Sequence, residues 1–161
     1  MWRRLRQSWL YLRPSGLTGR DRVWIASHLS EAQFRLFSAM GEPDQGHACR
    51  VARRLAERNA PRHVIEAALL HDCAKPASYG LFWRTIGVLA SPWLDSIPAD
   101  PPERGWRRAL QIYRWHDCYG LNLAREAGTS PEALELLASY AEESEAAPAW
   151  LGPLKECDDL G

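Results

Sequence analysis

The stretch Ala67-Ala-Leu-Leu-His-Asp-Cys-Ala-Lys75 decides the fold, because it places His71 and Asp72 side by side at the end of an apolar helical run that Pro76 closes. Upstream apolar residues follow helical spacing, so Asp72 continues the buried face. Burying an ionisable pair without a partner costs several kcal/mol by desolvation. A metal ion is the natural compensating cation, and the stretch therefore predicts a metal site at a helix end.

A second imidazole lies on an earlier helical pattern. His47 precedes Val51 by one turn and Leu55 by two turns, so the three side chains share one face of the predicted helix. Since that face is apolar, we expect His47 to point into the core. The sequence thus predicts that His47 lies beside the pair formed by His71 and Asp72.

A helix-borne His, a His-Asp pair in Leu-Leu-His-Asp-x-x-Lys and a later acidic residue on a helix together resemble the HD-domain metal-dependent phosphohydrolase superfamily, over roughly residues 30–145. The resemblance implies four metal ligands: His47, His71, Asp72 and Glu142. The family usually has Asp at the last position, in an Ala-Asp context, where this chain has Glu142 or Glu143. Glu142 is preferred, because it adjoins the apolar face of the last predicted helix.

A ligand set of imidazoles and carboxylates without thiolate suits ferrous iron, manganese, magnesium or zinc with open positions. A divalent ion lowers the pKa of bound water and polarises a phosphoryl oxygen, and phosphate-ester hydrolysis uses both effects. The resemblance implies that Asp72 also takes the proton from the attacking water. It implies a metal-dependent phosphohydrolase acting on a small phosphorylated substrate, with a nucleotide as the favoured class.

Two further residues are candidates for catalysis. Lys75 lies one turn after His71 and could neutralise charge that develops on the phosphate; the alternative is a solvated lysine, favourable at a helix C-terminus. His116 resembles the additional His that many superfamily members place near the phosphate or a second metal. Asp117 makes a second His-Asp pair with it, but no apolar helical run precedes this pair, and we assign Asp117 no role.

A second class of function stays open at this point. A non-catalytic HD-fold binding or regulatory module would keep the fold and could keep the ion. Its motivation is the Glu in place of the usual Asp, because Glu is one carbon longer and shifts the last ligand.

Composition bounds the class of protein. The chain has 161 residues, of which 46% are hydrophobic, and this fits one domain with a sizeable core. The formal net charge is zero, which gives a nucleic-acid partner no support. Four cysteines without C-x-x-C spacing indicate free thiols and a cytoplasmic protein. No apolar run approaches the roughly 20 residues of a membrane span.

We divide the chain into three parts. Residues 1–28 form a basic, aromatic N-terminal arm whose amphipathic start could contact anionic lipid weakly or pack back on the domain. Residues 29–147 form the HD-like helical domain. Residues 148–161 are expected to be a poorly ordered tail.

Local signals predict where several helices begin. Ser30, with Gln33 three residues later, makes a capping box. Asp44 is placed to cap the next helix, from about residue 45 to 58. Pro61 suits the first position of the helix after that.

Later in the chain, the aromatic and apolar residues 80–97 predict a short helix, and another is expected at about 106–115. Residues 116–120 interrupt that helix. Gly128 is the expected C-terminal cap of the segment that follows, and Pro131 starts the last clear helix. No segment alternates as a strand does. The prediction is a single, all-α, HD-domain-like bundle of about five to seven helices.

Overall fold

The computed structural model describes residues 16–75, 98, 104–142 and 148–160, and the regular elements within them are all helices. The helices are α2 (Gly19–His28), α3 (Glu31–Ser38), α4 (Glu42–Glu57), α5 (Arg62–Leu70), α7 (Trp106–Glu126), α8 (Pro131–Glu142) and α9 (Leu151–Leu160). The all-α prediction is confirmed. The helix expected at 80–97 and most of the predicted N-terminal arm lie outside the described residues.

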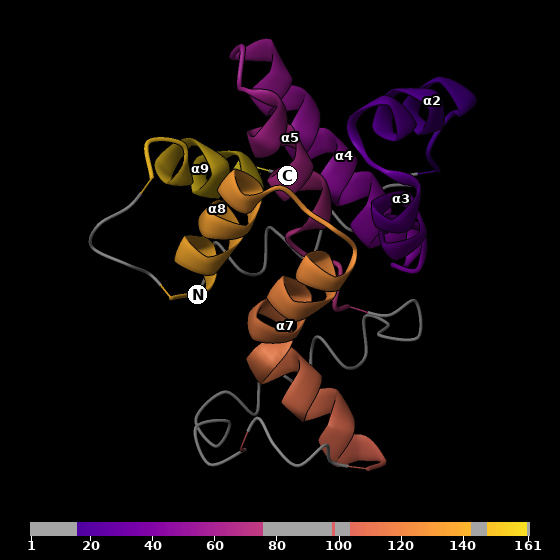
Figure 1. Cartoon of the computed structure of the whole chain (residues 1–161). Coiled ribbons are helices and arrows are strands. Elements are labelled where there is room, and N and C mark those ends of the chain that lie inside the picture. Colours follow the sequence, from indigo (N-terminus) through magenta and orange to yellow (C-terminus); the bar gives the residue numbers. More distant parts are fainter. Residues whose placement is uncertain (1–15, 76–97, 99–103, 143–147, 161) are drawn as a thin grey trace.

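The centre of the bundle is the pair α4 and α5. Helices α2 and α3 lie to one side of this pair and α8 and α9 to the other, while α7 extends away from the bundle (Figure 1). Helix α9 packs on α4 and α8, and α8 also packs on α5 and α7. Each of the seven described helices buries at least one apolar side chain in the core; examples are Ile25, Phe37, Leu55, Leu69, Ala124, Leu136 and Leu154. Burial of these side chains fixes the position of every helix that carries a candidate site residue.

The helix starts agree only partly with the predictions. The capping box of Ser30 and Gln33 is present at the start of α3, as predicted. Helix α4 begins earlier than expected, at Glu42, with Gly41 as its N-cap, so the prediction that Asp44 caps this helix is wrong. Pro43 is the physical reason, because its fixed φ and missing N–H suit the first turn. Asp44 is instead buried inside that turn.

The predicted interruption at residues 116–120 is a kink rather than a break. Helix α7 continues to Glu126, and Trp115 is the residue inside it with non-helical angles, φ −116° and ψ 15°. After the helix ends, Gly128 has φ +73°, the left-handed conformation that favours glycine at this position. Helix α8 then begins at Pro131, as predicted.

The C-terminal segment differs most from the expectation. Residues 148–161 were predicted to be a poorly ordered tail, but Leu151–Leu160 form helix α9. Three of its side chains, Leu151, Leu154 and Cys157, are spaced three residues apart and are buried in the core. Helix α9 is therefore an integral part of the bundle.

A polar contact fastens α2 to α4 and gives a pH-dependent prediction. Asp21 accepts hydrogen bonds from Thr18 in a capping box, and its Oδ1 lies 3.1 Å from Arg53 Nη2. The hydrogen bonds from Thr18 and then the contact with Arg53 lower the pKa of Asp21. A carboxyl with a lowered folded-state pKa contributes stability above its unfolded pKa, and this contribution is lost as the pH falls through the folded value.

We therefore expect Asp21→Asn protein to be less stable than wild type at pH 7, by less than about 1 kcal/mol because the contact is exposed. The difference should close as the pH falls below 3.8, the ordinary pKa of this carboxyl. Urea unfolding of both proteins between pH 7 and pH 3 measures this difference in the free energy of unfolding. A constant difference across this range would show that the charge of Asp21 does not contribute.

Candidate metal centre

Three side chains from distant parts of the chain meet inside the bundle. His47 comes from α4, His71 from the residue that caps the C-terminus of α5, and Asp158 from the last turn of α9. Each offers one ligand atom, and these atoms lie within 4.8 Å of one another. Both imidazoles are buried at 4% exposure. We call these three residues the His-His-Asp group, and it could hold a metal ion.

One oxygen of Asp158 faces both imidazoles. Asp158 Oδ1 lies 2.7 Å from His47 Nε2 and 3.3 Å from His71 Nε2. The two rings stand with their centroids 5.4 Å apart and their planes at 59°. Two nitrogen donors and a carboxylate thus converge on one small volume. This donor set suits iron, manganese or zinc.

The orientation of His71 provides a test of whether the group fits a metal. Its Nδ1 lies 2.8 Å from the carbonyl oxygen of Ala68, which can only accept a hydrogen bond, so Nδ1 carries a proton. In the neutral ring, Nε2 then has the free lone pair and points into the group. Nε2 is buried and has no hydrogen-bond partner among the residues that the structure describes. A ligating His commonly has its other nitrogen fixed in this way.

Asp72 lies at the edge of the group and is paired with Lys75. Asp72 Oδ2 is 3.7 Å from His71 Nε2, and Asp72 Oδ1 is 2.5 Å from Lys75 Nζ. The side chain of Lys75 is only 18% exposed, so it is not simply a solvated lysine at a helix end. Burial would raise the pKa of Asp72, but Lys75 and His71 outweigh it and hold this pKa well below its usual range. Asp72 is therefore ionised.

The environment favours positive charge at the centre of the group. Burial would lower the pKa of His71, but the carboxylates of Asp72 and Asp158 outweigh it and raise the pKa to about 9. Burial would likewise raise the pKa of Asp158, but the hydrogen bond with His47 and the charges of His47 and His71 lower it. A metal ion that binds to His71 must displace a proton, because a ligating imidazole is neutral.

Tyr140, in the last turn of α8, contacts two members of the group. Its hydroxyl donates a hydrogen bond of 2.7 Å to Asp158 Oδ2. Its ring meets the ring of His71 edge-on, with centroids 5.9 Å apart. Burial and the charge of Asp158 raise the pKa of Tyr140 far above its usual range, so the hydroxyl stays protonated.

The second His-Asp pair lies on α7, near enough to this region to act on it electrostatically. His116 follows the kink at Trp115, and its Nε2 is 3.2 Å from Asp117 Oδ1. The charge of His116 helps to lower the pKa of Asp72, and that of Asp117 helps to raise the pKa of Tyr140. Asp117, to which the sequence analysis assigned no role, is therefore part of the electrostatic surroundings of the site.

The structure describes the side chains of all the predicted site residues except Glu142. The structure brings His47, His71, Asp72 and Lys75 together and places His116 nearby. Glu142 is the last residue of α8, but its side chain lies outside the part that the structure describes, as does Glu143, so the prediction of Glu142 as a ligand is not tested. Among the residues that the structure describes, the carboxylate that lies close to both imidazoles is that of Asp158.

Asp158 was missed because it lay in the presumed tail. One signal could have found it: Asp158 follows a small residue, Cys157, much as Asp follows Ala in the context that the sequence analysis expected for the last ligand. The spacing of Leu151, Leu154 and Cys157 also marks a buried helix face that Asp158 adjoins.

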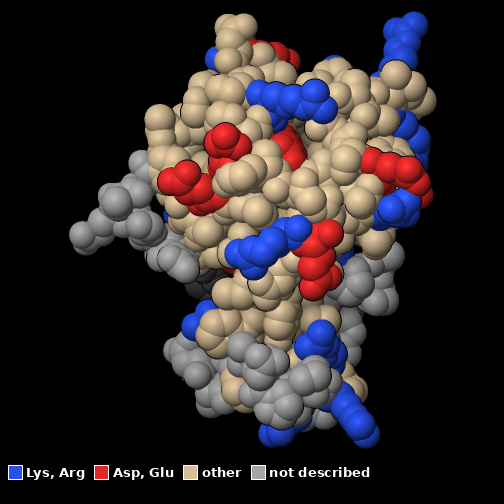
Figure 2. All heavy atoms as spheres, in the orientation of Figure 1, with Lys and Arg blue, Asp and Glu red and all other residues tan. Residues whose placement is uncertain are grey.

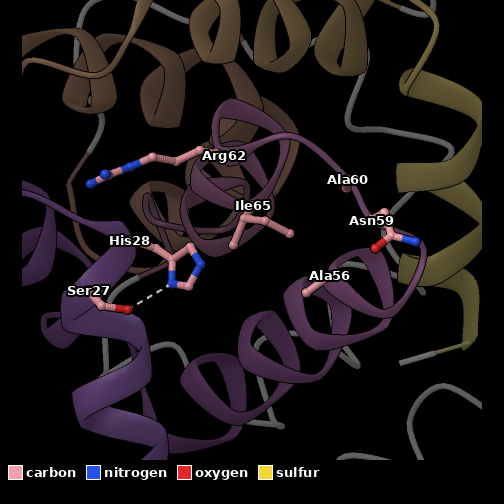
Figure 3. Close-up of a pocket in the computed structure, with 7 residues that line it drawn as sticks. All are labelled: Ser27, His28, Ala56, Asn59, Ala60, Arg62 and Ile65. Carbon is pink, nitrogen blue, oxygen red and sulfur yellow. Dashed lines mark hydrogen bonds between the residues drawn. The ribbon is translucent and has the colours of Figure 1, made fainter.

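A separate surface pocket of about 460 Å³ lies where α2 meets the turn between α4 and α5 (Figure 3). Its lining includes Ser27, His28, Asn59 and Arg62, and no member of the His-His-Asp group. Ser27 and His28 are both hydrogen-bonded to the carbonyl oxygen of Trp24. We assign no function to this pocket.

The described helices include none that is long and apolar enough to cross a membrane. Acidic and basic side chains are interspersed over the face shown in Figure 2. Comparison with known proteins gives no further guide, because no protein-family model matches the chain and no curated protein or solved structure matches it significantly.

Proposed function

We propose that this chain is a metal-dependent phosphohydrolase of the HD-domain kind that cleaves a small phosphate ester, with nucleotides as the first class to test. The observation that carries the proposal is the buried His-His-Asp group with Asp72 at its edge. A buried group of this composition supports a metal ion, because two imidazole nitrogens and a carboxylate oxygen lie within 4.8 Å of one another and the carbonyl oxygen of Ala68 fixes His71 Nδ1.

In this proposal, His47, His71 and Asp158 hold the ion, with Asp72 as the fourth candidate ligand. When bound, a divalent ion lowers the pKa of water and polarises a phosphoryl oxygen. Asp72 is ionised and one of its oxygens faces the group, so it can accept a proton there. Lys75 provides positive charge beside Asp72, and His116 adds to it when its imidazole is protonated, so an anionic phosphate would be stabilised there.

The alternative is a binding or regulatory module that keeps the fold but does not catalyse. Its motivation was the absence of an Asp as last ligand. Asp158 supplies such an Asp in the His-His-Asp group, which favours the catalytic proposal. The two proposals differ in turnover and not in metal content, so both quantities must be measured.

The test begins with elemental analysis of protein purified without chelator or affinity nickel. We expect near-stoichiometric iron, manganese or zinc in wild type and none in His71→Ala protein. With that metal, wild type should hydrolyse a member of a panel of nucleotides and other phosphate esters. Asp72→Asn should lower the rate by roughly 10²–10⁴-fold, the usual contribution of a general base.

Three outcomes would contradict the proposal. Undiminished turnover by Asp72→Asn protein would remove Asp72 from the mechanism. Metal content equal to wild type in His71→Ala protein would place the ion elsewhere. Metal binding without hydrolysis of any ester on the panel would favour the non-catalytic module.

A further inference from the structure

We infer that Tyr140 is a positioning residue of the metal centre: its hydroxyl holds one oxygen of Asp158, so that the other oxygen faces both imidazoles. This inference rests on the proposed metal site and concerns how that site is kept in shape. Tyr140 touches no reacting atom in this account. It acts through Asp158.

The two oxygens of Asp158 have different partners. Oδ1 lies 2.7 Å from His47 Nε2 and 3.3 Å from His71 Nε2, while Oδ2 accepts the 2.7 Å hydrogen bond from Tyr140. Rotation about the last side-chain bond of Asp is broad and roughly two-fold. A fixed donor on Oδ2 restricts that rotation, and it therefore determines which way Oδ1 points.

Tyr140 is itself held firmly enough to serve as this donor. One of its neighbours is the ring of His71, at 5.9 Å between centroids, and another is Lys155, whose Nζ lies 5.7 Å from the ring centroid. The hydroxyl has a single proton, which goes to Asp158 Oδ2. A hydrogen bond to an ionised carboxylate is among the stronger ones in proteins.

The hydrogen bond also joins two helices. Tyr140 lies in the last turn of α8 and Asp158 in the last turn of α9, and these helices pack on each other. The carboxylate of α9 must meet imidazoles carried by α4 and by the end of α5. Tyr140 sets the orientation of this carboxylate from α8, so α4, α5, α8 and α9 all contribute to one geometry.

If Tyr140 served only to strengthen the packing between α8 and α9, its substitution would have a different effect. Loss of its hydroxyl would then lower the free energy of unfolding and leave metal affinity unchanged. A positioning residue instead changes the metal affinity, and partners of metal ligands typically contribute 10–100-fold to it. Measuring both quantities separates these roles.

The test uses Co²⁺ as the probe, because its absorption reports the coordination geometry. The dissociation constant is measured by competition with a chelator for wild type, Tyr140→Phe and Lys155→Ala. We expect Tyr140→Phe to raise the constant by about 10–100-fold and to change the Co²⁺ absorption spectrum. Lys155→Ala alters the surroundings of the ring but keeps the hydroxyl, and it should bind Co²⁺ as wild type does.

A double-mutant cycle decides whether Tyr140 acts through Asp158. In protein that already carries Asp158→Ala, the further change Tyr140→Phe should cause no additional loss of Co²⁺ affinity. An equal loss in both backgrounds would overturn the inference, as would wild-type affinity in Tyr140→Phe protein. If wild type itself binds no Co²⁺, the proposed metal site fails and the inference fails with it; the other two outcomes overturn the inference alone.

Discussion

Asp158→Ala protein is expected to lose more than 100-fold in metal affinity, whereas Asp159→Ala protein should bind metal as wild type does. The loss should exceed the 10–100-fold effect of residues that only support a ligand, because in the proposed site Asp158 contributes a ligand oxygen directly. That oxygen lies within 3.3 Å of a nitrogen of each imidazole. Asp159 follows it on the same helix but is exposed and is not a member of the His-His-Asp group.

The two variants form a matched pair, since each removes one carboxylate from the same turn of α9 and changes the net charge equally. Competition titration with Co²⁺ or Zn²⁺ measures the affinity of both. An equal loss in the two variants would mean that the charge of α9 attracts the ion without a specific ligand. Adding Glu142→Ala tests the ligand expected from the sequence: loss of metal there, with retention in Asp158→Ala protein, would reverse the assignment.

The meeting of His47 with His71 was predictable because the signals are local. His47 continues one apolar helix face, and Asp72, the neighbour of His71, continues another; both faces can be recognised within two or three turns of sequence. Helices with such faces bury them against each other, and α4 and α5 are nearly consecutive in the chain. The same holds for Ser30 and Gln33, whose capping box is formed within a single turn.

Asp158 was not predictable in this way, because its contact with His47 spans 111 residues of sequence. The segment that carries it also contains Gly152 and Pro153, which usually indicate a turn or an irregular segment. In the structure these two residues lie in the first turn of α9, where the missing N–H of proline leaves no helical hydrogen bond unmade. Gly and Pro therefore indicate an irregular segment when they fall in the interior of an expected helix; in its first turn they are compatible with it.

The kink in α7 is a second feature that the local sequence did not predict correctly. Residues 116–120 looked like an interruption, yet the departure from helical geometry is confined to Trp115. Because the helix resumes at once, His116 and Asp117 stay on a rigid element rather than on a loop. Helix α7 also packs on α3 and α8, contacts between distant segments that a local sequence pattern does not encode.

Glu66→Ala protein is expected to be less stable than wild type by about 3 kcal/mol, because this substitution removes the centre of a buried hydrogen-bond network. Glu66 Oε1 accepts hydrogen bonds from Gln33 Nε2 at 2.5 Å and from the Ser130 backbone N–H at 3.0 Å. Glu66 Oε2 accepts one from the Ser130 hydroxyl at 2.7 Å. Gln33 and Glu66 are both buried. Without Glu66, Gln33 Nε2 would keep only its 3.2 Å hydrogen bond to Thr129 Oγ1. Both donors of Ser130 would lose their acceptor.

The network joins α3, α5 and the start of α8. Gln33 Oε1 accepts the hydrogen bond from the Ser30 backbone N–H that completes the capping box of α3, while its Nε2 donates to Glu66. Loss of Glu66 therefore also loosens the cap of α3. The cost is shared by three helices, although the substitution removes one side chain.

Two comparisons make the prediction specific. Glu132→Ala removes an exposed carboxylate from the first turn of α8 and should cost no more than about 0.5 kcal/mol. Glu66→Gln should cost much less than Glu66→Ala, because its amide oxygen can replace Oε1 and its amide N–H can donate to the Ser130 hydroxyl, which can accept as well as donate.

Urea unfolding followed by far-ultraviolet circular dichroism measures all three variants. Equal losses in Glu66→Ala and Glu132→Ala would show that charge near the start of α8, and not the buried network, accounts for the effect. A loss in Glu66→Gln as large as in Glu66→Ala would show that the network needs the negative charge itself. Hydrogen-bond geometry alone predicts that the free energy of unfolding of Glu66→Ala protein is far below that of Glu66→Gln protein.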